Sequence, residues 1–86
     1  MIINSFQGGF DKNLSYLIWC AKTKLAAIVD PSVEINPIIE AINQHNLILD
    51  KIFITHTHHD HIAYLDDYLH LYPNIQILCY HKSNLN

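Results

Sequence analysis

The sequence predicts an α/β fold in which an antiparallel hairpin precedes a β-α-β-α-β series. Three observations predict it. Two short apolar segments flank the polar turn Lys22-Thr23-Lys24, as in a hairpin. From Leu25 onward, apolar segments typical of buried strands alternate with segments of helical periodicity. The order of these later elements is strand, helix, strand, helix, strand, which predicts right-handed βαβ crossovers on a largely parallel sheet.

The expected strands are short and rich in β-branched and aromatic side chains. Gly8-Gly9 places a loop over residues 7–13, between the first two strands. The third strand is a continuous apolar run that stops at Asp30-Pro31. The predicted strands cover residues 2–6, 14–20, 25–29, 51–55 and 75–80.

Two helices are expected between the later strands. Asn36 is a suitable N-cap and Pro37 suits the first helical position, so the first helix should begin there. It should end near residues 44–46. The second helix should run from about residue 62 to 71, with Pro73 beyond its end. Their apolar stripes comprise Ile35, Ile38, Ile39 and Ile42 in the first helix, and Leu65, Tyr68, Leu69 and Tyr72 in the second.

A histidine cluster follows the predicted strand 51–55. Four of the seven histidines fall between His56 and His61, together with Asp60. Imidazole nitrogen and carboxylate oxygen are the ligands of zinc and other borderline divalent metals. The cluster occupies a strand-to-helix turn at the carboxyl end of a strand, where open α/β sheets hold their sites.

The spacing within the cluster indicates two metal positions. Alternate side chains of an extended chain point the same way, so His56 and His58 can face one metal. Asp60 and His61 fall where the chain turns into the helix, and they point to a neighbouring position. Metal pairs about 3.5–4 Å apart are a common hydrolytic arrangement.

Asp30 ends a strand that neighbours the histidine strand, so its carboxylate can reach the histidine turn. One interpretation is that Asp30 accepts a hydrogen bond from the N–H of a ligand histidine and so orients its ring. The other interpretation is an aspartate that caps its own turn. The sequence does not separate them.

The histidine segment resembles a known family. His-Thr-His-His-Asp-His, residues 56–61, fits the pattern His-x-His-x-Asp-His of the metallo-β-lactamase-like hydrolases. The strand Ala27 to Pro31 resembles the family's strand with its Asp-Pro turn. Phe10-Asp11 and Asn13 to Ile18 resemble the first hairpin of the thioester-cleaving branch. The chain looks most like the amino-terminal part of hydroxyacylglutathione hydrolase (glyoxalase II).

The resemblance implies that residues 1–86 form one partial domain, the amino-terminal part of the family's αβ/βα sandwich. It implies two Zn²⁺ ions in a full-length site, with iron or manganese as alternatives, and Asp60 as the residue that orients the attacking hydroxide. It also implies a thioester substrate, a glutathione conjugate, hydrolysed by metal-bound hydroxide. The ligands that complete the family's site have no counterpart in this chain, so whether it is an enzyme by itself stays open.

Two departures from the family's pattern concern the site. The metal motif of the family is usually followed by two small residues, but here Ile62 is followed by Ala63-Tyr64. The Tyr64 ring is expected near the mouth of the pocket. Ser32 also replaces the glycine that usually follows the Asp-Pro turn.

Three alternatives stay open. A persulfide dioxygenase of the same superfamily also resembles this chain in Phe10-Asp11 and in residues 14–18, and it would use one iron. A non-catalytic chain could bind only a metal or a partner. A histidine-rich surface turn that binds no metal is the third alternative for residues 56–61, and the coincidence of the cluster with a strand and a helix argues against it.

Composition excludes several partners. The net charge is −3 and no cluster of basic residues occurs, which argues against nucleic acid. No apolar run reaches the roughly 18 residues of a membrane span, and the start lacks a signal peptide's charged region, so a cytoplasmic protein is expected. Cys20 and Cys79 are expected to be reduced and mostly buried. An incomplete sandwich should expose an apolar sheet face, and self-association through it is expected.

Overall fold

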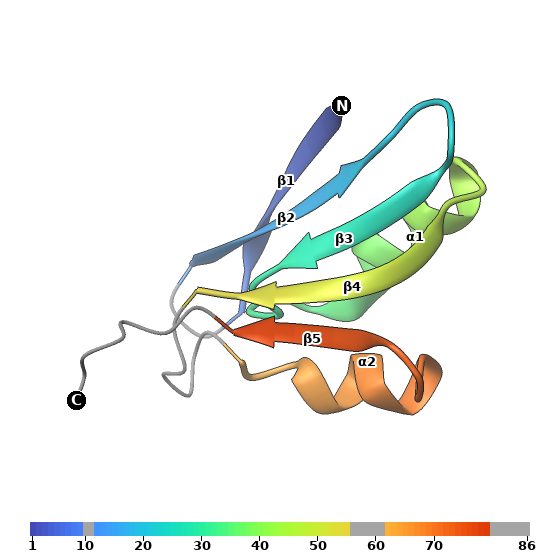
Figure 1. Cartoon of the computed structure of the whole chain (residues 1–86). Coiled ribbons are helices and arrows are strands. Elements are labelled where there is room, and N and C mark those ends of the chain that lie inside the picture. Colours follow the sequence, from blue (N-terminus) through green and yellow to red (C-terminus); the bar gives the residue numbers. More distant parts are fainter. Residues whose placement is uncertain (10–11, 56–61, 80–86) are drawn as a thin grey trace, which may run out of the picture.

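The computed structural model describes residues 1–9, 12–55 and 62–79 of the chain. Within these residues it contains a five-stranded sheet in the order β1-β2-β3-β4-β5 and two helices (Figure 1). The elements are β1 (Ile2–Gly8), β2 (Asn13–Trp19), β3 (Leu25–Val29), α1 (Ile35–Gln44), β4 (Ile48–Ile54), α2 (Leu65–Leu71) and β5 (Gln76–Cys79).

The topology confirms the predicted hairpin and parallel sheet. β1, β2 and β3 pair antiparallel, whereas β3, β4 and β5 pair parallel. Val29 pairs with Phe53, and Phe53 pairs with Leu78. The carboxyl ends of the three parallel strands therefore meet at one edge of the sheet, which is the edge where the histidine segment begins (Figure 1).

Two strands extend beyond the predicted bounds because pairing with a neighbour continues there. β4 begins at Ile48 rather than at residue 51, since Ile48 pairs with Leu25. A register shift opposite Ala26 and Ala27 leaves Asp50 as an extra residue, which is typical of a β-bulge. β1 continues to Gly8, inside the predicted loop, and pairs there with Asn13.

The predicted N-cap of α1 is wrong. The helix begins at Ile35, and Glu34 is the N-cap, with φ −54° and ψ 139° and no capping bond from its side chain. Pro37 still lies in the first turn, where backbone N–H groups have no intrahelical partner. Asn36 loses the capping role because the chain turns helical before it.

The carboxyl end of α1 closes with a Schellman motif, near the predicted end. Asn46 adopts a left-handed conformation with φ 55°. Its N–H donates to Asn43 O at 3.2 Å, and Leu47 N donates to Ile42 O at 2.9 Å. Asparagine tolerates this conformation better than other residues with a Cβ, which is why the helix ends here.

The second helix is shorter than predicted. Its N-cap is Tyr64, and residues 62–64 form a turn in which Leu65 N donates to Ile62 O at 3.1 Å. Asp66 and Asp67 are exposed in the first turn, as predicted, and suit the positive end of the helix dipole. No helix of the described residues is long and apolar enough to cross a membrane.

One face of the sheet carries the core. The buried side chains Ile38 and Ile42 of α1 and Tyr68 of α2 join alternate residues of β2, β3 and β4 in a single cluster. Figure 1 shows α1 behind the sheet. The sheet contributes Leu17, Trp19, Ala26, Ile28, Leu49, Ile52 and Ile54 to this cluster.

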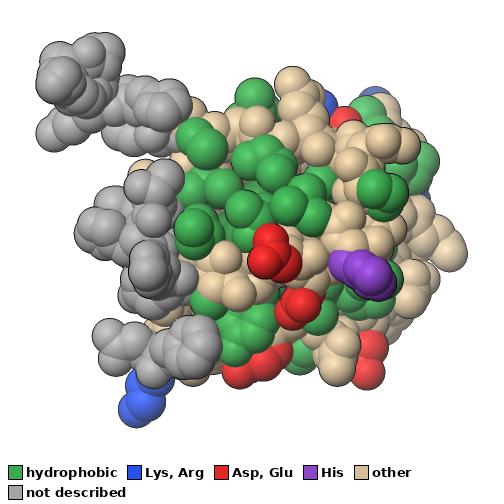
Figure 2. Space-filling view, turned by 90° about the horizontal axis from the view of Figure 1, so that it is seen from below, with side chains coloured by type: hydrophobic (Ala, Val, Ile, Leu, Met, Phe, Trp, Pro, Cys, Tyr) green, Lys and Arg blue, Asp and Glu red, His purple; other side chains and the backbone are tan. Residues whose placement is uncertain are grey.

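The opposite face of the sheet is apolar and partly exposed. Ile3 is 62% exposed, Leu14 45% and Leu25 46%, and Phe53 is half-buried. Seen from the side of α2, hydrophobic side chains also group beside acidic ones on the surface (Figure 2). Self-association through the exposed sheet face stays a prediction.

The Tyr68 hydroxyl allows a stability prediction. The side chain is fully buried, and its Oη is a buried polar atom without a hydrogen-bond partner among the described residues. Burial raises the pKa of this phenol far above its ordinary value of 10.0. Because removal of an unsatisfied hydroxyl relieves a desolvation penalty, Tyr68→Phe should stabilise the fold by about 1 kcal/mol in urea unfolding. Tyr72→Phe, which alters a partly exposed phenol, is the control; destabilisation by Tyr68→Phe would contradict the prediction.

Candidate metal centre

The predicted metal ligands lie outside the described residues. His56, His58, Asp60 and His61 fall between the two described segments that end at Thr55 and resume at Ile62. Within residues 1–9, 12–55 and 62–79, no group of three or more His, Cys, Asp or Glu side chains could hold a metal ion. The ligand set therefore stays a prediction, and the structure describes what surrounds it.

Asp30 binds the residue immediately before the histidines. Its side chain is 8% exposed and lies just beyond β3. Its Oδ1 accepts a hydrogen bond from Thr55 N at 2.7 Å, and its Oδ2 accepts one from Thr55 Oγ1 at 2.5 Å. Asp30 N in turn donates to Phe53 O at 2.8 Å. The end of β4 is thus held at two atoms of Thr55 and one of Phe53.

The backbone around Asp30 is adapted to this task. Asp30 has φ 59°, a left-handed conformation that aspartate tolerates better than most residues. Ser32 N donates to Asp30 O at 2.8 Å, and Ser32 Oγ donates to Leu14 O at 2.9 Å, so the loop is tied to β2 as well. The carboxylate reaches across to β4, as expected from the strand order. A bond from Asp30 to a ligand histidine stays a prediction.

The other end of the histidine segment is held by the same loop. Tyr64 N donates to Pro31 O at 3.0 Å, and the Tyr64 hydroxyl donates to Glu34 Oε2 at 3.3 Å. The β3–α1 loop, residues 30–34, therefore contacts the chain on both sides of residues 56–61. These hydrogen bonds fix Thr55 on one side of the histidine segment and Tyr64 on the other.

A hollow of about 340 Å³ lies at the carboxyl ends of β4 and β5. Cys79 is exposed there, contrary to the prediction of a mostly buried thiol, because β5 ends at this residue. The hollow includes Thr55, the residue that precedes the histidine segment. The residues that line it are Phe53, Ile54, Thr55, Leu78 and Cys79.

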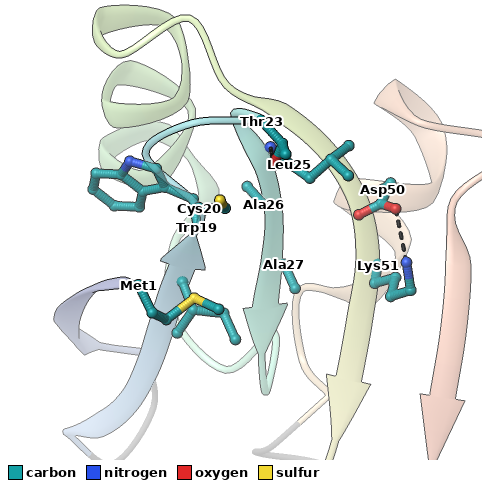
Figure 3. Close-up of a pocket in the computed structure, with 10 residues that line it drawn as sticks. Met1, Trp19, Cys20, Thr23, Leu25, Ala26, Ala27, Asp50 and Lys51 are labelled. Carbon is teal, nitrogen blue, oxygen red and sulfur yellow. Dashed lines mark hydrogen bonds and ion pairs between the residues drawn. The ribbon is translucent and has the colours of Figure 1, made fainter.

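A second cavity, of about 220 Å³, lies near the opposite end of the strands and is lined in part by Cys20 (Figure 3). Hydrogen bonds from the Thr23 hydroxyl, and then from the Thr23 and Lys22 backbone, lower the pKa of the Cys20 thiol to about 7. Lys51 and Asp50 form an ion pair at its rim, with 2.8 Å between Nζ and Oδ2. This cavity is separate from the edge where the histidines begin.

A comparison with protein families decides the relationship. The family model of the metallo-beta-lactamase superfamily matches residues 8–85 of this chain. The chain belongs to the metallo-beta-lactamase superfamily.

Individual members of the superfamily agree. The hydroxyacylglutathione hydrolase of Aliivibrio fischeri is 41% identical over 51 residues, which cover 59% of this chain and 20% of that protein. The hydroxyacylglutathione hydrolase 2 of Vibrio vulnificus is 36% identical over 69 residues, which cover 80% of this chain and 27% of that protein. The chain therefore spans about a fifth to a quarter of the length of these relatives.

Solved structures of the superfamily share the fold. A metallo-beta-lactamase from Staphylococcus aureus aligns with a TM-score of 0.76 and 28% identity, over 98% of this chain and 25% of that one. ETHE1 from Myxococcus xanthus aligns with a TM-score of 0.75 and 25% identity, over 88% of this chain and 34% of that one. The described sheet and helices are thus part of the superfamily's fold.

The superfamily's donor set fits this chain. Four imidazoles, three of them predicted ligands, and one carboxylate lie within six residues, directly after a strand whose last residues are fixed by a buried aspartate. Nitrogen and oxygen donors of this kind suit zinc and similar divalent metals. Sequence reasoning identified these residues and Asp30, but it missed Thr55 and Glu34 as partners. A hydroxyl directly before the histidines was the only available signal for Thr55.

Proposed function

We propose that the whole protein is a metal-dependent hydrolase that cleaves a thioester, specifically a hydroxyacyl-glutathione. The observation that carries this proposal is the 41% identity to a hydroxyacylglutathione hydrolase, together with the Asp30–Thr55 anchor that leads into the motif. Because this chain covers only a fraction of those relatives, the activity is proposed for the whole protein. A cytoplasmic location and Zn²⁺ as the metal belong to the same proposal.

The proposed hydrolase assigns a role to each predicted metal ligand and to the two residues that precede the motif in space. His56 and His58 would hold one metal ion, and Asp60 and His61 would hold a second. When bound, such ions lower the pKa of water and polarise a carbonyl group, so that water attacks at neutral pH. Asp60 would also accept a hydrogen bond from the attacking water and orient it toward the thioester carbonyl. Asp30 and Thr55 would not touch the metal, but their hydrogen bonds fix the backbone immediately before His56.

A second candidate is a persulfide dioxygenase-like protein that uses a single iron. The structural similarity to ETHE1 supports this second candidate. The two candidates share the fold and the histidine segment, but they differ in the metal. Metal analysis of the purified protein separates them, since two zinc-type ions support the hydrolase and one redox-active iron supports the alternative.

The decisive experiment is hydrolysis of a hydroxyacyl-glutathione by the protein as it is encoded in full. We expect release of free glutathione thiol, measured with a thiol reagent, to be lost after chelation and restored by Zn²⁺. A folded, metal-loaded protein that leaves the thioester intact would overturn the hydrolase. The same sample, tested for oxygen uptake with a glutathione persulfide, then decides whether the second candidate replaces it.

A further inference from the structure

Glu34 lies where three segments of the chain meet at one edge of the sheet. Its Oε1 accepts a hydrogen bond from Gly9 N at 3.0 Å, and its Oε2 accepts one from the Tyr64 hydroxyl at 3.3 Å. Gly9 belongs to the turn after β1, Glu34 to the β3–α1 loop, and Tyr64 to the turn before α2. One carboxylate therefore joins segments that are 25 and 30 residues away in sequence.

The turn after β1 has no room for larger residues at this contact. Gly9 has φ 76°, and a Cβ added to it would collide with the carbonyl oxygen of Ser32. A Cβ added to Gly8 would come within 2.5 Å of Glu34 Oε1. Gly9 thus permits the close approach of this turn to the β3–α1 loop, whereas a Cβ at Gly8 would displace the Glu34 carboxylate that fixes it.

The charges agree with this arrangement. Hydrogen bonds from its own backbone N–H and from Gly9 hold the pKa of Glu34 below its ordinary value of 4.5. Desolvation, and then the nearby Glu34 charge, raise the pKa of Tyr64, which keeps the phenol protonated as a donor. The Glu34 side chain makes no capping bond to α1, so it does not compete for the helix N–H groups while it binds Gly9 and Tyr64.

We propose that Glu34 is a positioning residue, which ties the turn after β1 to the segment that carries the histidines into α2. Tyr64 follows His61 by three positions, so its placement sets the exit of the histidine segment, as Asp30 and Thr55 set its entry. The positioning role of these Glu34 hydrogen bonds rests on the proposed metal site.

The test compares Glu34→Ala and Glu34→Gln in the full chain, with Glu40→Ala as the matched control because Glu40 is an exposed glutamate of α1. Hydrogen exchange of the Gly9 amide, followed by NMR, directly reports its hydrogen bond to Glu34 Oε1. Loss of a hydrogen bond to a carboxylate should raise that exchange rate about tenfold in Glu34→Ala. Glu34→Gln, which keeps an acceptor oxygen, should recover most of the protection, and Glu40→Ala should match the wild type.

Zinc affinity, measured by calorimetry on the same samples, reports the positioning role. We expect Glu34→Ala to weaken zinc binding about tenfold and Glu34→Gln to restore most of it. If the wild type binds zinc and Glu34→Ala matches it in both measurements, the proposal is overturned while the metal site stands. A wild type that binds no zinc would overturn the proposed function and the positioning role together, even if Gly9 exchange still responds to Glu34→Ala.

Discussion

Replacement of His58 with alanine is expected to lower the affinity of this protein for Zn²⁺ about a hundredfold or more. His58 is the predicted partner of His56 on the first metal, and a site that keeps one imidazole cannot hold the ion tightly. Calorimetric titration of the metal-free chain, with elemental analysis of the loaded protein, measures the loss. Thioester hydrolysis by the full protein should fall with it, because the metal supplies the reactive water.

The control is His70→Ala. His70 is an exposed histidine of α2, outside the motif, so its loss tests whether any imidazole contributes to metal uptake. We expect zinc affinity within about twofold of the wild type, because His70 is not one of the predicted ligands. Weak uptake by a histidine-rich tract would instead depend on the number of histidines rather than on their positions. Equal losses in His58→Ala and His70→Ala would contradict a built site and favour adventitious binding.

Replacement of Asp30 with alanine should destabilise the fold by about 3 kcal/mol. The change removes the charged acceptor of two hydrogen bonds from Thr55, and it places alanine in a left-handed conformation. The midpoint of urea unfolding measures the effect. Zinc affinity should also drop about tenfold, because the backbone before His56 is released.

Two variants separate the causes. Asp30→Asn keeps an acceptor and tolerates the left-handed backbone, so it should lose only the charge-assisted part of the stabilisation. Thr55→Val removes the hydroxyl but keeps the N–H that Asp30 Oδ1 binds, and about 1 kcal/mol of destabilisation is expected. Wild-type stability and zinc affinity in Asp30→Ala would show that the anchor has no role.

The strand and helix types were predictable because each has a local signal. Apolar runs between turns predicted all five strands, and the isoleucine stripe of residues 35–42 predicted α1. Their bounds were less predictable. β4 begins at Ile48 because β3 offers a pairing partner there, and that partner comes from another part of the chain. Asn36 had the better capping side chain, yet the helix starts after Glu34, whose carboxylate is used by Gly9 and Tyr64.

Some residues of the candidate site were likewise predictable from the sequence and others were not. The histidine motif is contiguous, so its ligand types and spacing can be recognised without a fold. Asp30 was also within reach of sequence reasoning, because neighbouring parallel strands end at one edge. Its partner, Thr55, was not identified, since no pattern connects residues that are 25 positions apart.

The sequence by itself determined the fold class, the superfamily and the segment that carries the predicted metal ligands, because each is encoded in consecutive residues or in a regular period. Only the tertiary structure decided how that segment is bracketed, with Asp30 on Thr55 at its entry and Pro31 and Glu34 on Tyr64 at its exit. The physical reason is that these bonds join distant parts of the chain. Their geometry exists only once the parallel strands have brought their carboxyl ends together.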